Sequence, residues 1–376
     1  MANLTREAVL AWLSGGGLSP DQLREALRLK EPEEVCADFR RTGRMELPEE
    51  SVSRRSLELL RAGLAEENLS RVQQMVSAHG IRAMTCFDEA YPSKLRDLPE
   101  APAILFYQGN PAAAEKDSVA MVGSRSASYR CLEAARKIAE RLSRNDIVIV
   151  SGLAYGIDTA AHEGCLKGKA PTVAVLGCGL DQQYPAENAP LRHRIVEDGG
   201  LILSEYAPGE KPLGRHFPWR NRIISGLGDC LAMMEARIRS GSMTTVQHAL
   251  NQGKDVFVYP GEPGSPRSEG NHQLLREGGI YFTEAEDILE DMGWLDKRGD
   301  VRQNIGSSAP DSTSAVSGID RQVLDELDRG ERSFDQLCAA LNLPAASLSA
   351  SLSMLQIQGL IRALPGKVYQ KKEGQD

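Results

Sequence analysis

The sequence predicts an α/β protein built around a doubly wound, mostly parallel β-sheet. Short apolar runs recur between residues 118 and 282, separated by segments long enough to form helices. Each run is almost continuously apolar rather than alternating, which is typical of parallel strands that helices cover on both faces. Such βαβ units have right-handed crossovers, so residues 110–295 are expected to form a Rossmann-like sheet. The predicted strands are 118–123, 146–152, 172–177, 201–205, 229–235, 255–260 and 280–282.

Smaller segments are expected on the N-terminal side of this sheet and directly after it. Residues 1–80 have the apolar spacing of short helices broken by glycine and proline, and Ser19-Pro20 is a typical helix start. The sheet domain, 81–298, begins with short strands and proline turns. The serine-rich residues 299–317 have almost no apolar periodicity, so they are expected to form a flexible linker.

The C-terminal segment, 318–376, has a winged-helix-like pattern. Two helices, a turn at Asn342–Pro344, a third helix and an apolar hairpin around Pro365-Gly366 follow one another. The third helix, 345–360, takes the place of a recognition helix, but it contains no Lys or Arg. A helix that reads duplex DNA normally offers basic groups to phosphates and bases, so contact with a protein is favoured over sequence-specific contact with DNA.

Composition and charge restrict the classes of function. Apolar residues make up 41% and charged residues 26% of the chain, as in an ordinary globular protein. No apolar run approaches the roughly 20 residues that span a bilayer, and the first residues do not resemble a signal peptide, so a cytoplasmic protein without membrane contact is expected. The seven cysteines are scattered, which favours reduced thiols. The net charge of −8 argues weakly against nucleic acid, but Lys and Arg outnumber acids within 119–152 and 211–239.

The first glycine turn of the predicted sheet is not a cofactor fingerprint. Gly123 stands alone where dinucleotide-binding proteins have three glycines, and the second strand ends in Ser151 rather than an acidic residue. A P-loop would need glycine at the position of Glu163. Asp158 and His162 are interpreted as helix residues with a structural role. No cofactor, no metal and no catalytic residues are therefore expected.

Small residues gather at the predicted strand ends, where open α/β sheets bind their ligands. Glycine and serine let backbone amides approach an anion closely. Glycine also ends strands for structural reasons, so one such loop is weak evidence, whereas several around one rim indicate a phosphate-binding surface. The strand-end peptides are 123–125, 151–156, 177–179, 204–206, 235–242 and 260–265, and Ser151 and Gly152 of the second are candidate phosphate contacts.

The segment 215-RHFPWRNRIISG-226 adds cations and aromatic rings to this rim. Arg220 and Arg222 fall in the first turns of a predicted helix, where arginine is unfavourable on dipole grounds unless an anion lies nearby. Phe217 and Trp219 offer flat faces on which bases could stack, as in single-strand complexes. Arginines, rings and glycine turns without a catalytic group favour a platform for single-stranded nucleic acid over an enzyme pocket.

A structural interpretation of the same segment stays open. Both aromatic rings could belong to the core, and the arginines could pair with acids such as Glu205 and Glu235. The two basic stretches could likewise be ordinary solvated helix faces.

The motifs between residues 85 and 295 resemble those of the DNA-processing protein A family (DprA, also called Smf). In the family's order come VGSRSASYR, IVSGLAYGIDTAAHEGCL, VLGCGLDQQYP, GGLILSEYAPG, FPWRNRIISGLGD, RSGSMTTVQHALNQGKDVFVYPG and SEGNHQLLREGG. The resemblance implies a Rossmann-type domain that binds single-stranded DNA without strict sequence preference, between a sterile-alpha-motif-like (SAM-like) helical domain and a winged helix. It further implies a homodimer that helps to load the RecA recombinase during natural transformation, without cofactor or turnover.

The resemblance also implies which residues contact DNA, although contacts to RecA and between subunits do not map onto short motifs. The sequence departs from the family pattern at Arg130, where glycine is expected, and at Met233-Met234, which replace β-branched residues. The implied contacts are Gly123, Ser124 and Arg125 from GSR; Phe217, Arg220, Asn221 and Arg222 from FPxRNR; Lys211 or Arg215 from the basic position before it; Gly241 and Ser242 from SGS; and Gly270 and Asn271 from SEGNHQLL.

Two other classes of function fit the sequence less well. Phosphoribohydrolases of the LOG type carry a PGGxGTxxE signature whose glutamate works on the ribose, and the corresponding turn here, 240-SGSMTTVQHA-249, has no glutamate. A transcriptional regulator would read duplex DNA with the uncharged helix 345–360. The LOG-like enzyme is therefore the alternative to single-stranded DNA binding.

Overall fold

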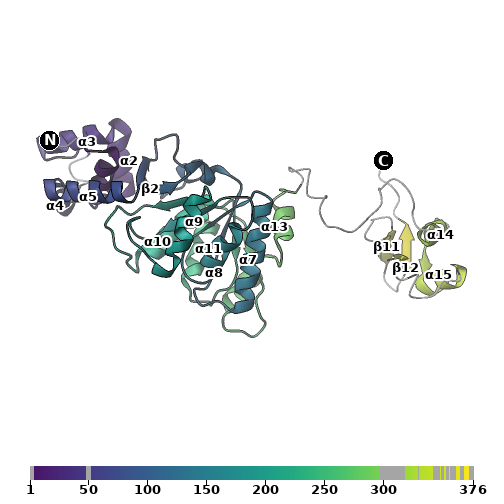
Figure 1. Ribbon diagram of the computed structural model, residues 1–376. Coiled ribbons are helices and arrows are strands. Elements are labelled where there is room, and N and C mark those ends of the chain that lie inside the picture. The colour runs from purple at the N-terminus through teal and green to yellow at the C-terminus, as the bar shows by residue number, and fades with distance from the viewer. Residues whose placement is uncertain are drawn as a thin grey trace. The chain divides into compact units, whose positions relative to one another are not determined.

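A computed structural model describes residues 4–47, 52–295, 318–328, 330–341, 348, 351–352, 355, 361–364 and 368–371. The chain divides into two compact units, residues 1–299 and 300–376. The first unit contains a helical segment and a large sheet, purple to green in Figure 1, and the second is the small yellow domain. The predicted linker, 299–317, lies outside the described residues. No helix in the described parts of the chain is long and apolar enough to cross a membrane.

The N-terminal helices begin where capping residues stand in the sequence. Ser19 and Gln22 form a capping box at the predicted start, with Pro20 in the first helical position. The indole of Trp12 donates to the carbonyl of Leu60 over 2.8 Å, which joins the first and fourth helices. Their apolar side chains share one core with strands of the large sheet. The helices are α1 (Arg6–Ser14), α2 (Pro20–Leu29), α3 (Pro32–Thr42), α4 (Arg54–Gly63) and α5 (Glu66–Ala78).

The large sheet has the strand order β1-β2-β6-β5-β4-β3-β7-β8-β9. From β6 to β9 along this order, which includes β5, β4, β3, β7 and β8, each strand pairs in parallel with the next. Strands β1 and β2 are added antiparallel at the β6 edge. Every strand predicted between 118 and 282 is present, and the doubly wound, mostly parallel sheet is confirmed. The bounds are β1 (Arg82–Thr85), β2 (Ile104–Gly109), β3 (Ser118–Val122), β4 (Val148–Ser151), β5 (Thr172–Leu176), β6 (Leu201–Ser204), β7 (Cys230–Met233), β8 (Val256–Val258) and β9 (Ile280–Tyr281).

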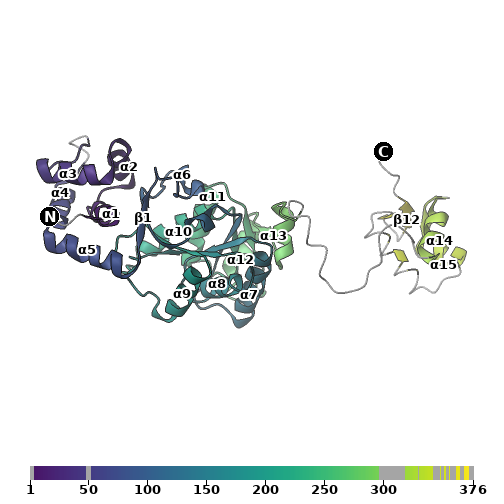
Figure 2. The same cartoon turned by 45° about the horizontal axis from the view of Figure 1, so that its top comes forward.

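Helices cover both faces of the sheet (Figure 2), which explains the continuously apolar strands. Val119 and Met121 of β3 point to one core, and Ala120 and Val122 point to the other. The first core holds α7 (Tyr129–Arg144), α8 (Ile157–Cys165) and α13 (Ala285–Asp291), and the second holds α6 (Ser93–Arg96), α10 (His216–Leu227), α11 (Gly241–Asn251) and α12 (Glu269–Arg276). Helix α9 (Ala189–Glu197) joins the core of the N-terminal helices.

The second unit has helices and a small antiparallel sheet of order β10-β12-β11. Its core contains Val323, Leu337, Leu352 and Ile361. The predicted turn at 342–344, most of the helix 345–360 and the hairpin tip at 365–366 lie outside the described residues. The described elements are α14 (Gly318–Leu327), β10 (Arg332–Ser333), α15 (Phe334–Leu341), β11 (Ile361–Leu364) and β12 (Val368–Lys371).

Candidate nucleic-acid interface

A cavity of about 620 Å³ opens where the chain reverses direction across the sheet. Strand β3 lies between β4 and β7, so the connections that leave β3 and β7 diverge to opposite faces and leave a crevice at their carboxyl ends. The cavity is lined by Val122, Gly123, Ser124, Arg125, Ser126, Ala154, Asp158, Tyr184, Pro212, Gly214, Phe217, Pro218, Arg220, Asn221, Ile224, Ser240, Gly241, Ser242 and Thr245. The structure thus brings together the GSR turn, the first turns of α10 and the start of α11.

The GSR turn packs too tightly for any side chain at Gly123. A Cβ there would lie 2.6 Å from Ile157 Cγ1 and 3.1 Å from the carbonyl oxygen of Glu235. The Ser124 amide donates to that same Glu235 carbonyl over 2.7 Å, and the Ser124 carbonyl accepts from the Ile157 amide. The turn therefore offers the cavity the side chains of Ser124 and Arg125 rather than the Ser124 amide.

Phe217 forms the aromatic centre of the cavity. The guanidinium carbon of Arg125 lies 5.2 Å from the ring centroid, and that of Arg220 lies 5.9 Å away. The ring of Tyr184 packs at 5.5 Å with an interplanar angle of 42°. Gly177 makes room for the Phe217 ring, because a Cβ on Gly177 would lie 3.0 Å from Phe217 Cδ1. A cation, a hydroxylated ring and a half-buried phenyl face together match what an unstacked base and its phosphate require.

Arg220 places a fixed positive charge at the cavity floor. Its Nη1 donates to the carbonyl of Gly152 over 3.0 Å and to the carbonyl of Val175. Burial lowers the pKa of Arg220 to about 10, so the guanidinium is still protonated at neutral pH. A Cβ on Gly152 would lie 2.7 Å from Arg220 Nη2 and 2.8 Å from Asp158 Oδ2, so only glycine fits between them.

Asp158 is the acidic residue of the cavity, and it is bound by the protein itself. Its Oδ2 accepts from the amides of Gly152 and Ala154 over 3.2 and 3.3 Å. Burial raises the pKa of Asp158, and the Arg220 charge opposes that rise. Ser151 beneath it donates to the Met121 carbonyl over 2.7 Å and is fully buried. Ser151 and Gly152 thus support the cavity floor from within the protein and do not face the ligand space.

Asn221 joins α10 to the start of α11. Its Nδ2 donates to the carbonyl of Gly241 over 3.2 Å and to Thr244 Oγ1 over 3.0 Å. The side chain of the N-cap residue, Ser240, does not cap the first turn of α11, whose residues Gly241 and Ser242 line the cavity. This end of the helix carries partial positive charge, so it adds to the field of the two arginines.

Arg222 and Trp219 lie away from the cavity, which changes the predicted contact set. Arg222 makes a double hydrogen bond to Glu205 at 2.6 and 3.0 Å, and its Nε donates to the Glu100 carbonyl. Its guanidinium carbon is 4.3 Å from the Trp219 ring centroid. For Arg222 the structural interpretation holds, because it pairs with Glu205, whereas Trp219 is 39% exposed and does not belong to the core. Helix α10 turns by about 100° per residue, so Arg220 and Arg222 point in different directions.

Gly270 and Asn271 are also buried inside the protein. Asn271 Oδ1 accepts from the Ala236 amide over 2.7 Å, and its Nδ2 donates to the carbonyls of Met234 and Tyr259. A Cβ on Gly270 would lie 2.7 Å from the Ala236 carbonyl. Gly270 and Asn271 hold the loop after β7, Ser151 and Gly152 build the cavity floor, and Arg222 pairs with Glu205. We therefore leave these five residues out of the proposed contacts.

The basic position before α10 stays at the rim. Lys211 and Arg215 are both exposed, and two of the three residues between them, Pro212 and Gly214, line the cavity. Either side chain could therefore reach a phosphate at the cavity mouth.

Sequence reasoning missed Tyr184 and gave Asp158 only a helical role. Tyr184 lies beyond the strand-end peptide 177–179, so the rule that predicts ligands at strand ends pointed to its neighbourhood but not to the residue. Asp158 was visible as an acid in the first turn of α8, but its place on the cavity floor depends on Arg220, 62 positions later.

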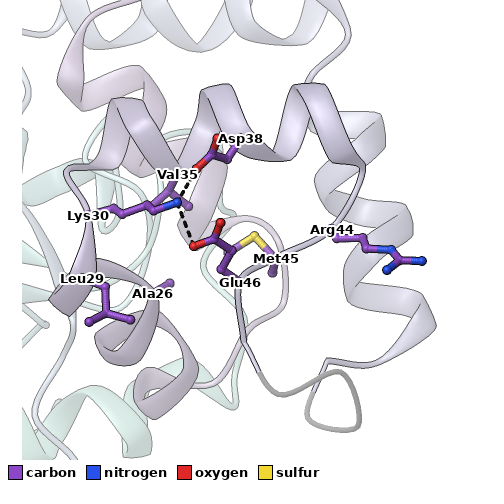
Figure 3. A pocket seen from close by; sticks show the side chains of 8 residues that line it. All are labelled: Ala26, Leu29, Lys30, Val35, Asp38, Arg44, Met45 and Glu46. Atoms are coloured by element: carbon purple, nitrogen blue, oxygen red, sulfur yellow. Dashed lines mark hydrogen bonds and ion pairs between the residues drawn. The ribbon is translucent and has the colours of Figure 1, made fainter.

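A small hollow among α2 and α3 has a different character (Figure 3). Its volume is about 20 Å³, and the ammonium of Lys30 pairs with Asp38 and Glu46. A site of that size, whose ammonium is already neutralised by two carboxylates, has no room for a nucleotide. The crevice at β3 is the candidate site because it gathers the GSR turn, the first turns of α10 and the start of α11 in one cavity.

Family comparisons agree with this architecture. The family described as "DNA recombination-mediator protein A" matches residues 82–293, and the "DprA winged helix domain" matches residues 307–367. "DNA processing protein DprA" of Streptococcus pneumoniae is 44% identical over 207 residues, which is 55% of this chain and 73% of that protein. "Protein Smf" of Escherichia coli is 36% identical over 282 residues, 74% of each chain.

Two solved structures resemble the fold. The X-ray structure of DprA from S. pneumoniae has a TM-score of 0.62 and 34% identity, over 77% of this chain and 98% of that one. DprA from Helicobacter pylori, whose structure is described for its single-stranded DNA binding mode, has a TM-score of 0.52 and 28% identity, over 58% and 96%. With a family match over more than half of its length, the chain belongs to the DNA-processing protein A (DprA/Smf) family.

Proposed function

We propose that this protein binds single-stranded DNA, without strict sequence preference, in the cavity at the carboxyl ends of β3, β4 and β7. The observation that carries the proposal is the pairing of Arg125 with Phe217, 5.2 Å apart at the cavity mouth. The ring can stack on any base, and the guanidinium can bind the adjoining phosphate. The proposed contacts are Gly123, Ser124, Arg125, Lys211, Arg215, Phe217, Arg220, Asn221, Gly241 and Ser242.

The charge of the cavity supports an anionic ligand. Arg125 and Arg220 face it, and the carboxylate of Asp158 is already held by two amides. The exposed start of α11 adds partial positive charge. The net field is positive in a protein whose overall charge is −8, so the attraction is local rather than general.

An unpaired strand suits this cavity better than a duplex. Stacking on Phe217 requires a base whose face is free, and the ring lies half buried within the cavity, where a paired base cannot reach it. The single-stranded DNA binding described for the H. pylori relative supports the same choice.

We further propose that the protein acts without turnover, forms a homodimer and helps to load RecA on DNA. The family description as a recombination mediator supports the RecA role. Light scattering of the purified chain would test the dimer, and RecA filament formation on DNA coated with a single-strand-binding protein would test the loading. The expected cytoplasmic location stays a prediction.

A competition experiment tests the DNA-binding proposal and its enzyme alternative together. A labelled 20-nucleotide oligo-dT is bound by the full-length protein, and unlabelled oligo-dT, an unrelated mixed sequence, duplex DNA and AMP are added separately. We expect both single strands to compete equally and AMP and duplex to compete poorly. Strong competition by AMP would instead favour the LOG-like phosphoribohydrolase, and strong competition by duplex would contradict the single-strand proposal.

A further inference from the structure

The loop between β7 and α11 carries an exposed tip, Arg237, Ile238 and Arg239, beside the cavity. All three side chains are exposed, and that of Ile238 is 49% exposed. The next residues along the chain, Ser240 to Ser242, line the cavity. The tip is therefore the first surface that a strand would meet on leaving the cavity over α11.

Among the described residues, the two arginines of the tip have no acidic partner. Within the part of the chain that the structure describes, neither guanidinium makes a hydrogen bond or an ion pair, whereas those of Arg130, Arg136 and Arg222 each pair with a glutamate. They also precede the uncapped start of α11, which is an unfavourable place for cations. Two exposed cations without an acidic partner are free to bind an anion from another molecule, which would also offset their unfavourable position before the helix start.

The base of the tip is held from two sides. Asn271 bonds to the Ala236 amide over 2.7 Å and to the Met234 carbonyl over 3.0 Å, and the Gly270 amide donates to the Ala236 carbonyl over 2.9 Å. On the other side, the Glu235 carbonyl accepts from the Ser124 amide of the GSR turn. The loop is thus fixed relative to the cavity, so a ligand has less backbone motion to suppress on binding.

We propose that Arg237 and Arg239 bind phosphates of the single strand outside the cavity, with Ile238 packed against a base between them. The inference rests on the proposed function and extends its site. A cavity of about 620 Å³ is in the range that encloses one small ligand. A longer strand must therefore continue over the surface, and the tip is a basic surface next to the cavity wall on the side of α11, whereas Lys211 and Arg215 lie on the side of α10. Asn271 and Gly270 act here as positioning residues.

The double variant Arg237→Gln/Arg239→Gln tests the tip in the full-length protein. Binding of a 20-nucleotide and a 3-nucleotide oligo-dT is measured by anisotropy between 50 and 200 mM salt. Two lost phosphate contacts should lower the salt slope for the long oligonucleotide by about 1.4, which is a roughly sevenfold change in the affinity ratio over that range. The short oligonucleotide should bind the variant as it binds the native protein.

Lys167→Gln/Lys169→Gln is the matched control. These two lysines have the same spacing and are exposed, but they precede β5, at the amino ends of the strands rather than at the carboxyl ends where the cavity lies. The control should keep the native slope. Equal slope changes in the two double variants would show a general charge effect and overturn the proposal, as would an unchanged slope in the arginine variant.

The positioning role has a separate readout. Asn271→Ala should lower the salt slope as the arginine variant does, and the triple variant should lose no more than the arginine variant. A loss of melting temperature with a native slope would show that Asn271 is only structural. If the native protein binds oligo-dT and Arg125→Ala lowers the slope while the tip variant does not, the proposed function stands and the tip is excluded. If the native protein binds no oligo-dT, the proposed function itself fails.

Discussion

Arg125 and Arg222 have the same side chain, but the structure predicts opposite consequences when each is replaced by alanine. Arg125 is exposed at the cavity mouth, and its described contact is the face of Phe217. Arg222 is 2% exposed and makes a double hydrogen bond to Glu205. Loss of Arg125 should therefore weaken DNA binding, whereas loss of Arg222 should weaken the fold.

The two magnitudes follow from these environments. Removing one phosphate contact lowers the salt slope of single-strand binding by about 0.7, so the affinity lost in Arg125→Ala should be about threefold larger at 50 mM than at 200 mM salt. Removing Arg222 leaves the Glu205 carboxylate in a largely buried site without a partner, which costs about 3–5 kcal/mol of unfolding free energy.

Two measurements separate the cases. Anisotropy of labelled oligo-dT across the salt range gives the slope, and urea unfolding at 25 °C gives the stability. Arg222→Met combined with Glu205→Leu should recover most of the stability lost in Arg222→Ala, because the uncompensated charge is gone. An unchanged slope in Arg125→Ala would refute the cavity as the binding site. A reduced slope with native stability in Arg222→Ala would refute the internal role of that arginine.

Three further predictions follow from other parts of the sheet unit. Gly156→Ala should reduce both stability and DNA affinity, because its φ is +78° and a Cβ would lie 2.3 Å from the Ser124 carbonyl; Gly253→Ala, also at positive φ but with open space around it, should leave affinity unchanged in the same assay. His162 is buried neutral with a pKa of about 3, so its contribution to stability is complete above pH 6.5 and falls as pH drops toward 3. At pH 5 the loss is about 2 kcal/mol, and urea unfolding of His162→Gln at pH 7 and pH 5 should show a correspondingly smaller pH dependence; an unaltered dependence would contradict it. Deleting 318–376 should leave oligo-dT affinity within about twofold, since 1–299 is a compact unit, and a collapse of affinity would make the winged helix the DNA module.

The sheet could be predicted because its signal is local. Each parallel strand from β3 to β9 is a short apolar run bounded by glycine or polar residues, and burial on both faces forces that pattern within a few consecutive positions. The same locality let the sequence indicate the cavity, because the rule about carboxyl strand ends needs only the strands and the order of their connections. Gly123 was identified in this way, whereas Phe217 was identified from the arginines and aromatic rings of the segment 215–226.

The roles of individual polar residues were decided by the tertiary structure. Arg220 and Arg222 stand two positions apart, yet one lines the cavity and the other pairs with Glu205, because the direction of a helical side chain depends on how the helix packs. Asn271 belongs to the family motif, but its side chain forms its hydrogen bonds with the loop after β7. The sequence by itself determined the sheet, the family and the rim of the site. Only the three-dimensional packing decided which polar groups are already satisfied inside the protein and which are left for a ligand, since a hydrogen-bond partner many residues away leaves no trace in the local pattern.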